Sequence, residues 1–134
     1  SFYFFAPAVN EKNAEKFTIA RIIENRNSGK ITIINFTADW CPNCKLVEKT
    51  VLRSKTVLEL LSRENIAFMT ADVTRKNPDA ETLMAKLGSK SIPFLAVFPP
   101  GEGFSSPICL RDLYSSDDVV RAVSIAEKSV KKQR

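Results

Sequence analysis

The most constraining feature of this sequence is an apolar, β-branched run that ends shortly before two closely spaced cysteines. Residues 31–37 read Ile-Thr-Ile-Ile-Asn-Phe-Thr, which is typical of a central strand buried on both faces. Cys41 and Cys44 follow, with Pro42 and Asn43 between them, and an amphipathic helix pattern begins at once. Proline is tolerated at the first helical position, because the N–H that it lacks would be unpaired there. A strand that delivers a C-x-x-C motif to a helix N-terminus is the layout required for reversible dithiol chemistry.

The two cysteines occupy different places in this layout and are predicted to have different roles. Cys41 falls at the junction of strand and helix, where unpaired backbone N–H groups and the helix dipole favour a thiolate. We therefore expect Cys41 to be the exposed, attacking sulfur. Cys44 comes one helical turn later, and we expect it to be the more buried thiol that resolves a mixed disulfide. A zinc half-site and a pair of inert core cysteines are the two alternatives.

The absence of histidine and the small number of cysteines limit the reactions and metal sites that are possible. The sequence holds three cysteines and no histidine, which excludes Cys-His catalysis and every histidine-ligated metal site. Cys109 alone adds too few ligands to complete a zinc site with the pair, so we expect no bound metal. The odd number of cysteines also excludes a disulfide scaffold. Cys109 is expected to be a small apolar residue of the last strand, with a regulatory or intermolecular thiol as the alternative.

The net charge of +5 does not by itself indicate a nucleic-acid partner. Lys and Arg alternate with acidic residues, and the basic cluster at 128–134 is typical of cations that complement the dipole of a helix end. The apolar runs are too short to span a bilayer. The chain begins at Ser1 without a charged segment ahead of an apolar one, so we expect a processed or excised piece of a longer protein.

Other residues are predicted to support the cysteine pair. Trp40 either shields one side of the sulfurs and offers a flat surface to partners, or packs in the core. Glu48 comes four residues after Cys44 and so falls on its face of the helix. Its carboxylate either moves the proton when Cys44 attacks or simply lies at a helix edge. A cis bond between Ile92 and Pro93 would let the backbone of Ile92 face the cysteines and pair with an extended substrate, whereas a trans turn proline is the default.

Strand and helix signals alternate along the rest of the chain, which indicates an α/β fold whose parallel core is completed by an antiparallel hairpin. Residues 14–134 are expected to form this one domain, and residues 1–13 an N-terminal arm or linker. The inward stripes of the first and last helices are expected to contain Ile19, Ile22 and Ile23, and Val119, Val120, Val123, Ala126 and Val130. The expected elements are strand 16–17, helix 18–26 capped by Thr18, strand 31–37, helix 42–50, a helix capped by Ser54, strand 66–73, a helix from Asn77 to Gly88, strands 94–98 and 108–110, and a helix capped by Ser116-Asp117-Asp118.

Over residues 14–130 these features resemble the thioredoxin superfamily. The resemblance rests on Trp40-Cys41-x-x-Cys44-Lys45, on the later Ile92-Pro93 pair and on the order of the elements. Residues 36–41, Lys45, Glu48 and 71–74 are most similar to the C-terminal periplasmic domain of the DsbD family of transmembrane electron transporters. The superfamily resemblance implies the thioredoxin fold, with a central mixed sheet of four or five strands flanked by helices on both faces. It also implies a cis bond at Pro93, Cys41 as nucleophile and Cys44 as resolving thiol.

The resemblance further implies a thiol–disulfide oxidoreductase that reduces extracytoplasmic protein disulfides, with the Cys41–Cys44 disulfide as its only redox group. An upstream reductant, such as a membrane electron-transfer domain, would supply the electrons, with a link to cytochrome c maturation. We expect a monomer in the bacterial periplasm or elsewhere outside the cytoplasm, with membrane tethering in the full-length protein, while a cytoplasmic location stays open. The alternatives are a disulfide oxidase or isomerase, a non-catalytic binding module, and a Cu(I)-binding module.

Four positions depart from the pattern of the superfamily. Asn35 stands where many relatives carry a buried acid, and an amide cannot act as a base, so proton handling is expected to rest on Glu48 or water. Phe94 stands where a threonine often follows the proline. Pro42 and Asn43 replace the Gly-Pro of ordinary thioredoxins, so the redox potential cannot be carried over.

Overall fold

Strand β2 lies at the centre of a five-stranded sheet with the order β1-β3-β2-β4-β5. The computed structural model describes residues 14–132. Strands β1, β3 and β2 are parallel, β4 is antiparallel to β2, and β5 is antiparallel to β4. The predicted α/β architecture with a mixed sheet is confirmed. The elements are β1 (Glu15–Lys16), α2 (Ile19–Asn27), β2 (Ile31–Thr37), α3 (Pro42–Val47), a π-helix (Glu48–Leu52), α4 (Lys55–Leu61), β3 (Ile66–Asp72), α5 (Pro78–Lys86), β4 (Phe94–Phe98), a 3-10 helix (Gly101–Ser105), β5 (Ile108–Arg111) and α6 (Ser116–Lys132).

The central strand is fixed on both edges and on both faces. All seven residues of β2 are buried, as its β-branched and apolar composition predicted. In the ladder, Ile34 pairs with Met69 of β3 on one side and with Ala96 of β4 on the other. Ile33 joins the core on one face of the sheet, whereas Phe36 joins the core on the opposite face. The segment that leaves the carboxyl end of β2 therefore starts from a rigid position.

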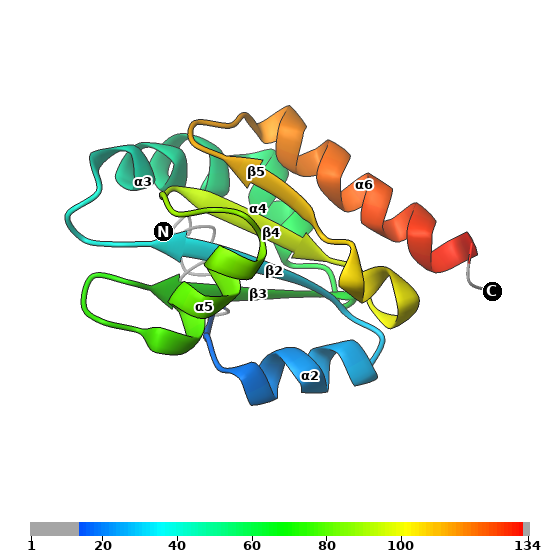
Figure 1. Ribbon diagram of the computed structural model, residues 1–134. Helices are drawn as coiled ribbons and strands as arrows, with labels where there is room; N and C mark the ends of the chain where they lie inside the picture. Colours follow the sequence, from blue (N-terminus) through cyan, green and yellow to red (C-terminus); the bar gives the residue numbers. More distant parts are fainter. Residues whose placement is uncertain (1–13, 133–134) are drawn as a thin grey trace.

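Helices cover both faces of the sheet, as expected (Figure 1). Helices α2 and α5 pack on one face, where Phe36 and Phe94 place their ring centroids 5.4 Å apart. Helices α3, α4 and α6 pack on the other face, and Val57 of α4 and Val123 of α6 are completely buried there. Burial of one such side chain contributes roughly 1.5–3 kcal/mol. The two cores together hold the sheet as a fixed base for its loops.

Side-chain caps define where the helices begin. Thr18 and Ser54 accept the N–H groups of Arg21 and Val57, as predicted. The predicted cap of α6 is wrong by one residue, because Ser115 rather than Ser116 occupies the N-cap. The Ser115 hydroxyl accepts the N–H of Asp118 at 3.1 Å, and the Asp118 carboxylate accepts the N–H of Ser115 at 2.9 Å. This reciprocal capping box pairs two backbone donors that the helix start would otherwise leave unpaired.

The predicted inward stripes of α2 and α6 are partly wrong. Ile22 is buried, but Ile19 and Ile23 are 41% and 48% exposed. Asn25 takes the second buried position of α2, with its amide 3.9 Å from the sulfur of Met69. Val120 of α6 is likewise exposed. Apolar composition alone therefore overestimated how far around each helix the buried face extends.

The helix after the cysteines changes its hydrogen-bond pattern midway. A single α-helix from 42 to about 50 was expected, but α3 ends at Val47 and a π-helix runs from Glu48 to Leu52. The N–H of Arg53 donates to the carbonyl of Glu48 at 3.0 Å, five residues back. Such π-turns occur frequently at functional sites. Here the change of pattern begins at Glu48.

Element boundaries otherwise differ little from the prediction. The first strand is shifted by one residue to Glu15–Lys16, and a 3-10 helix (Gly101–Ser105) lies between β4 and β5. The arm or linker predicted for residues 1–13 lies outside the described residues. Across residues 14–132, no helix combines the length and the apolar character that a membrane span needs.

Candidate functional site

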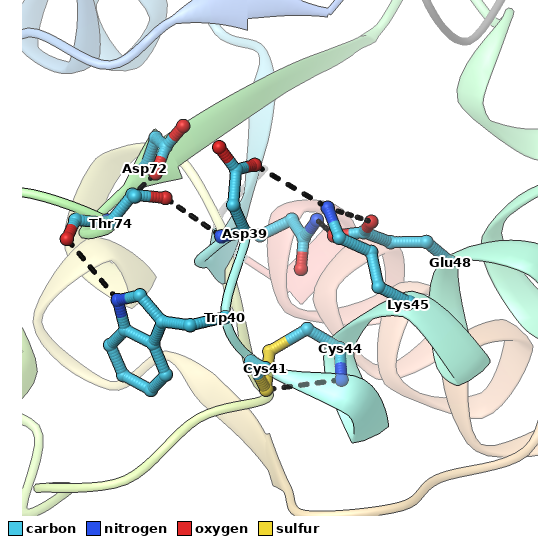
Figure 2. A network of polar contacts seen from close by, with 9 residues as sticks. Asp39, Trp40, Cys41, Cys44, Lys45, Glu48, Asp72 and Thr74 are labelled. Carbon is cyan, nitrogen blue, oxygen red and sulfur yellow. Dashed lines mark hydrogen bonds and ion pairs between the residues drawn. A yellow bond between two sulfur atoms is a disulfide. The ribbon is translucent and has the colours of Figure 1, made fainter.

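Cys41 and Cys44 form a disulfide at the start of α3, with their Cα atoms 5.2 Å apart. Cys41 is the N-cap residue of this helix, and its backbone is extended. Its sulfur accepts a hydrogen bond from the N–H of Cys44 at 3.1 Å (Figure 2). A backbone donor directed at Sγ stabilises negative charge on it. The geometry is therefore that of a sulfur able to leave or attack as a thiolate.

The surroundings make the two sulfurs unequal. Cys44 is completely buried, whereas Cys41 retains 6% of its surface. Both pack against Ala38, and the partly buried side chains of Val73 and Ile92 pack against this cluster. Pro42 and Asn43 are exposed. A partner molecule approaching from solvent therefore meets Cys41 first.

Trp40 lies on the surface beside the disulfide and is 63% exposed, so core packing does not hold it. Its indole N–H donates to the carbonyl of Thr74 at 3.2 Å, and the Thr74 hydroxyl accepts the N–H of Asp39 at 2.7 Å. The carboxylate of Asp72 accepts the N–H of Thr74 at 2.8 Å. Hydrogen bonding from Thr74 lowers the pKa of Asp72. Figure 2 shows these bonds joining the loop after β3 to the segment before Cys41.

The peptide bond between Ile92 and Pro93 is cis. Pro93 is buried at the start of β4, and its carbonyl accepts the N–H of Asp112 at 3.0 Å. Ile92 packs on the cluster that contains both cysteines. The alternative of an ordinary trans proline is therefore wrong. Two loops distant in sequence meet beside the disulfide.

Asn35 and Glu48 meet beneath the surface of the same region. The Asn35 amide donates to the carboxylate of Glu48 at 3.1 Å, and Asn35 is 4% exposed. The ammonium of Lys45 lies 3.6 Å from the Asp39 carboxylate and 3.9 Å from that of Glu48. Because Lys45 and Asp39 are largely exposed, these ion pairs contribute little to stability. The Asn35–Glu48 contact is the buried part of the network.

A polar hollow of about 370 Å³ opens onto this contact and is lined by Asn35, Thr37 and Glu48 among others. The Oδ1 of Asn35 and the hydroxyl of Thr37 are buried and have no hydrogen-bond partner among the described residues. Buried polar atoms of this kind are usually paired with protein or ordered water. The Glu48 side chain is 20% exposed and reaches solvent at this hollow, whereas the two unpaired atoms of Asn35 and Thr37 stay buried beneath its surface.

Sequence reasoning missed three residues of the site. Thr74 anchors Trp40, as described above. Tyr114 is buried, and this burial is the main reason that the pKa of its hydroxyl is raised. The negative charge of Glu48 is the second reason. Asp112 adopts a φ of 59°, a left-handed conformation that is uncommon outside glycine. Thr74 falls in the stretch 71–74 that carries the family resemblance, but its contacts with Asp39 and Trp40 are distant in sequence, so no local pattern predicts them. The same holds for the contact of Asp112 with Pro93 and for the proximity of Tyr114 to Glu48.

Cys109 is separate from the cysteine pair. It lies in β5, half-buried, opposite Ala96 of β4, and packs on the α2–α5 side of the sheet. Burial raises the pKa of its thiol. Its predicted placement in the last strand is confirmed.

Comparisons with known proteins agree with this geometry. The family model described as thioredoxin-like matches residues 19–100. The thiol:disulfide interchange protein DsbD 1 of Pseudomonas aeruginosa is 32% identical over 82 residues, which cover 61% of this chain and 14% of that protein. A DsbD of Campylobacter jejuni is 23% identical over 100 residues, which cover 75% of this chain and 17% of that protein. The chain therefore spans less than a fifth of either relative.

Solved structures show the same fold. The oxidised C-terminal domain of DsbD from Neisseria meningitidis aligns with a TM-score of 0.63 at 20% identity, covering 84% of this chain and 98% of that domain. Chloroplastic thioredoxin z also aligns with a TM-score of 0.63 at 20% identity, covering 87% of this chain and 96% of the other. The predicted thioredoxin fold is confirmed, with five strands. The chain belongs to the thioredoxin-like family, as a domain related to the C-terminal domain of DsbD.

Proposed function

We propose that this domain is a protein-disulfide reductase that acts by thiol–disulfide exchange. The observation that supports this most strongly is the Cys41–Cys44 disulfide, with a partly accessible Cys41 hydrogen-bonded by the N–H of a fully buried Cys44. Relatives named as thiol:disulfide interchange proteins support the same class of reaction.

In the proposed reaction the reduced domain donates two electrons to a substrate disulfide. The thiolate of Cys41 attacks one substrate sulfur, so that a mixed disulfide forms and the other substrate sulfur leaves as a thiolate. Cys44 then loses its proton and attacks the sulfur of Cys41. The second substrate sulfur leaves, and the domain holds the Cys41–Cys44 disulfide. An upstream dithiol must reverse these steps to restore the reduced domain.

Residues around the pair would place the substrate. Trp40, fixed by Thr74, offers an exposed ring beside Cys41. Ile92 lies next to both cysteines, and its backbone would pair with an extended substrate segment. Pro42 and Asn43, exposed between the cysteines, would face the bound partner.

Glu48 would serve as the proton acceptor when Cys44 attacks. The carboxylate is held by the amide of Asn35 at 3.1 Å and lies on the polar hollow that reaches solvent. Asn35 itself cannot accept a proton, so its role would be to position Glu48. A positioned carboxylate of this kind typically contributes 10²–10⁴-fold to a proton-transfer step.

The cellular setting is proposed from the relatives alone. A domain related to DsbD would work in the bacterial periplasm or elsewhere outside the cytoplasm, as a monomeric unit tethered within a longer membrane protein. A membrane electron-transfer domain would reduce it, and extracytoplasmic protein disulfides, including those of cytochrome c maturation, would be its substrates.

Reduction of insulin disulfides by the pre-reduced domain tests the proposal. Wild-type protein should reduce insulin, Cys41→Ser should be inactive, and Cys44→Ser should accumulate a mixed disulfide with the substrate. A Cys41→Ser variant that reduces insulin at the wild-type rate would overturn the assignment. The matched control is Cys109→Ser, which should retain wild-type activity.

A further inference from the structure

A pocket adjoins the disulfide on the side of Trp40. Its volume is about 700 Å³, within the range of roughly 300–1,000 Å³ that is usual for binding pockets. Val73 and Ile92 belong both to its wall and to the cluster around the two cysteines. A substrate segment whose cysteine is joined to Cys41 can therefore continue directly into this pocket.

This pocket is formed by helix α5 and two loops, and its interior is mostly apolar. Trp40 stands at one side, Met84 and Ala85 of α5 line the wall, and Ile92 lies at the cysteine end. Met84 is almost fully buried, whereas Trp40 leaves most of its surface in solvent. An incoming apolar side chain would cover the exposed Trp40 ring and contact the side chain of Ile92, and methionine adapts its shape to such a guest.

Four charged residues line the pocket, and positive charge predominates. Arg75 and Lys76 come from the loop after β3, and Lys90 comes from the loop before Pro93. None of these three exposed cations forms an ion pair with a residue in the described range 14–132. Glu81 is the one acid in the lining. Its carboxylate accepts the N–H of Asn77 at 2.8 Å and so already has a hydrogen-bond partner at the start of α5.

From this arrangement we infer that the pocket selects protein substrates whose reacting cysteine is flanked by an apolar side chain and by carboxylates. The inference rests on the proposed function and adds the class of substrate. The apolar side chain enters between Trp40 and Met84, and the carboxylates pair with Arg75, Lys76 and Lys90. Charges at the rim of an interface mainly raise the association rate and select among partners.

Three synthetic peptides test this inference, each with one cysteine joined by a disulfide to thionitrobenzoate. All three carry leucine near the cysteine, and the flanking residues are glutamate, lysine or alanine. Release of thionitrobenzoate gives the second-order rate constant for the pre-reduced domain. At low ionic strength the acidic peptide should react about tenfold faster than the basic one, and about 0.5 M salt should remove most of the difference.

Charge reversal at the pocket should invert the preference. The double variant Lys76→Glu/Lys90→Glu should react faster with the basic peptide. The control Lys55→Glu/Lys128→Glu makes the same change in net charge on α4 and α6, which pack on the other face of the sheet, and should keep most of the acidic preference.

The outcomes separate the two proposals. Failure of the wild-type domain to reduce the alanine peptide contradicts the proposed function. Reduction of all three peptides at equal rates contradicts the substrate inference alone. Equal loss of preference in both double variants also overturns it, because net charge rather than the pocket would then explain the selectivity.

Discussion

Replacing Asn35 by aspartate should make the stability of the domain strongly dependent on pH. In the wild-type protein the Asn35 amide donates a hydrogen bond to the Glu48 carboxylate at 3.1 Å. The substitution replaces this amide by a second carboxyl group. Two unit charges at that distance repel by about 5 kcal/mol at an effective dielectric constant of 20. The position is only 4% exposed, so burial adds to the repulsion. The pair is therefore expected to keep one shared proton, as carboxyl dyads do.

The magnitude follows from the pKa of the introduced carboxyl. A rise of about 3 units above its ordinary value near 3.9 is usual for such sites. When folding raises the pKa of a carboxyl group, that group destabilises the folded protein only at pH values above its unfolded-state pKa. The Asn35→Asp variant should thus resemble wild type near pH 3.5 and lose about 4 kcal/mol of unfolding free energy by pH 7.

Urea unfolding of the oxidised domain between pH 3.5 and 8 measures this effect, because the disulfide removes Cys41 and Cys44 from the titration. The double variant Asn35→Asp/Glu48→Gln is the matched control, since an amide at position 48 can donate to the new carboxylate. It should recover most of the lost stability. A constant difference between Asn35→Asp and wild type across this pH range would refute the reasoning.

Three further predictions concern the cap of α6, the exposed ring and the Asp72–Thr74 contact. Ser115→Ala should lower the unfolding free energy by about 1 kcal/mol while Ser124→Ala, a change of the same kind within α6, alters it little, and equal losses would contradict the assigned capping box. Trp40→Ala should slow insulin reduction by about 30-fold, as loss of a central contact does, but should slow reduction of the small hydroxyethyl disulfide much less. Asp72 has a lowered pKa, so its stabilising effect is present above the unfolded-state pKa and is lost as pH falls through the lowered one. The stability advantage of wild type over Asp72→Asn should shrink in acid, and an advantage that grows there would contradict the contact with Thr74.

Local patterns predicted the centre of the fold well. Residues 31–37 are mostly apolar or β-branched, which is typical of a buried strand, and Pro42 at a first helical position indicated the start of α3. Caps such as Thr18 depend on a few neighbouring residues and were predicted for the same reason. The N-cap of α6 was predicted at Ser116 instead of Ser115, because the three successive polar residues from Ser115 to Asp117 give equally good local signals for a cap.

Contacts between distant segments were harder to predict. Ile19 and Ile23 fit a helical stripe, yet only the packing of α2 on the sheet decides which side is buried. The bond between Asn35 and Glu48 depends on where the π-helix that follows α3 lies relative to β2, and the anchoring of Trp40 depends on the loop after β3. Most residues of the candidate site were named from the sequence, but the structure was needed to show which of them touch.

The reduction potential of the Cys41–Cys44 couple tests the central claim most directly. Equilibration of the domain with a glutathione or dithiothreitol buffer series, read by thiol alkylation, gives this value. The Cys109→Ser variant keeps the third thiol out of the measurement. The account predicts a reducing potential, closer to about −270 mV than to about −120 mV, whereas a value near about −120 mV would mark an oxidant and contradict the proposed direction of electron flow.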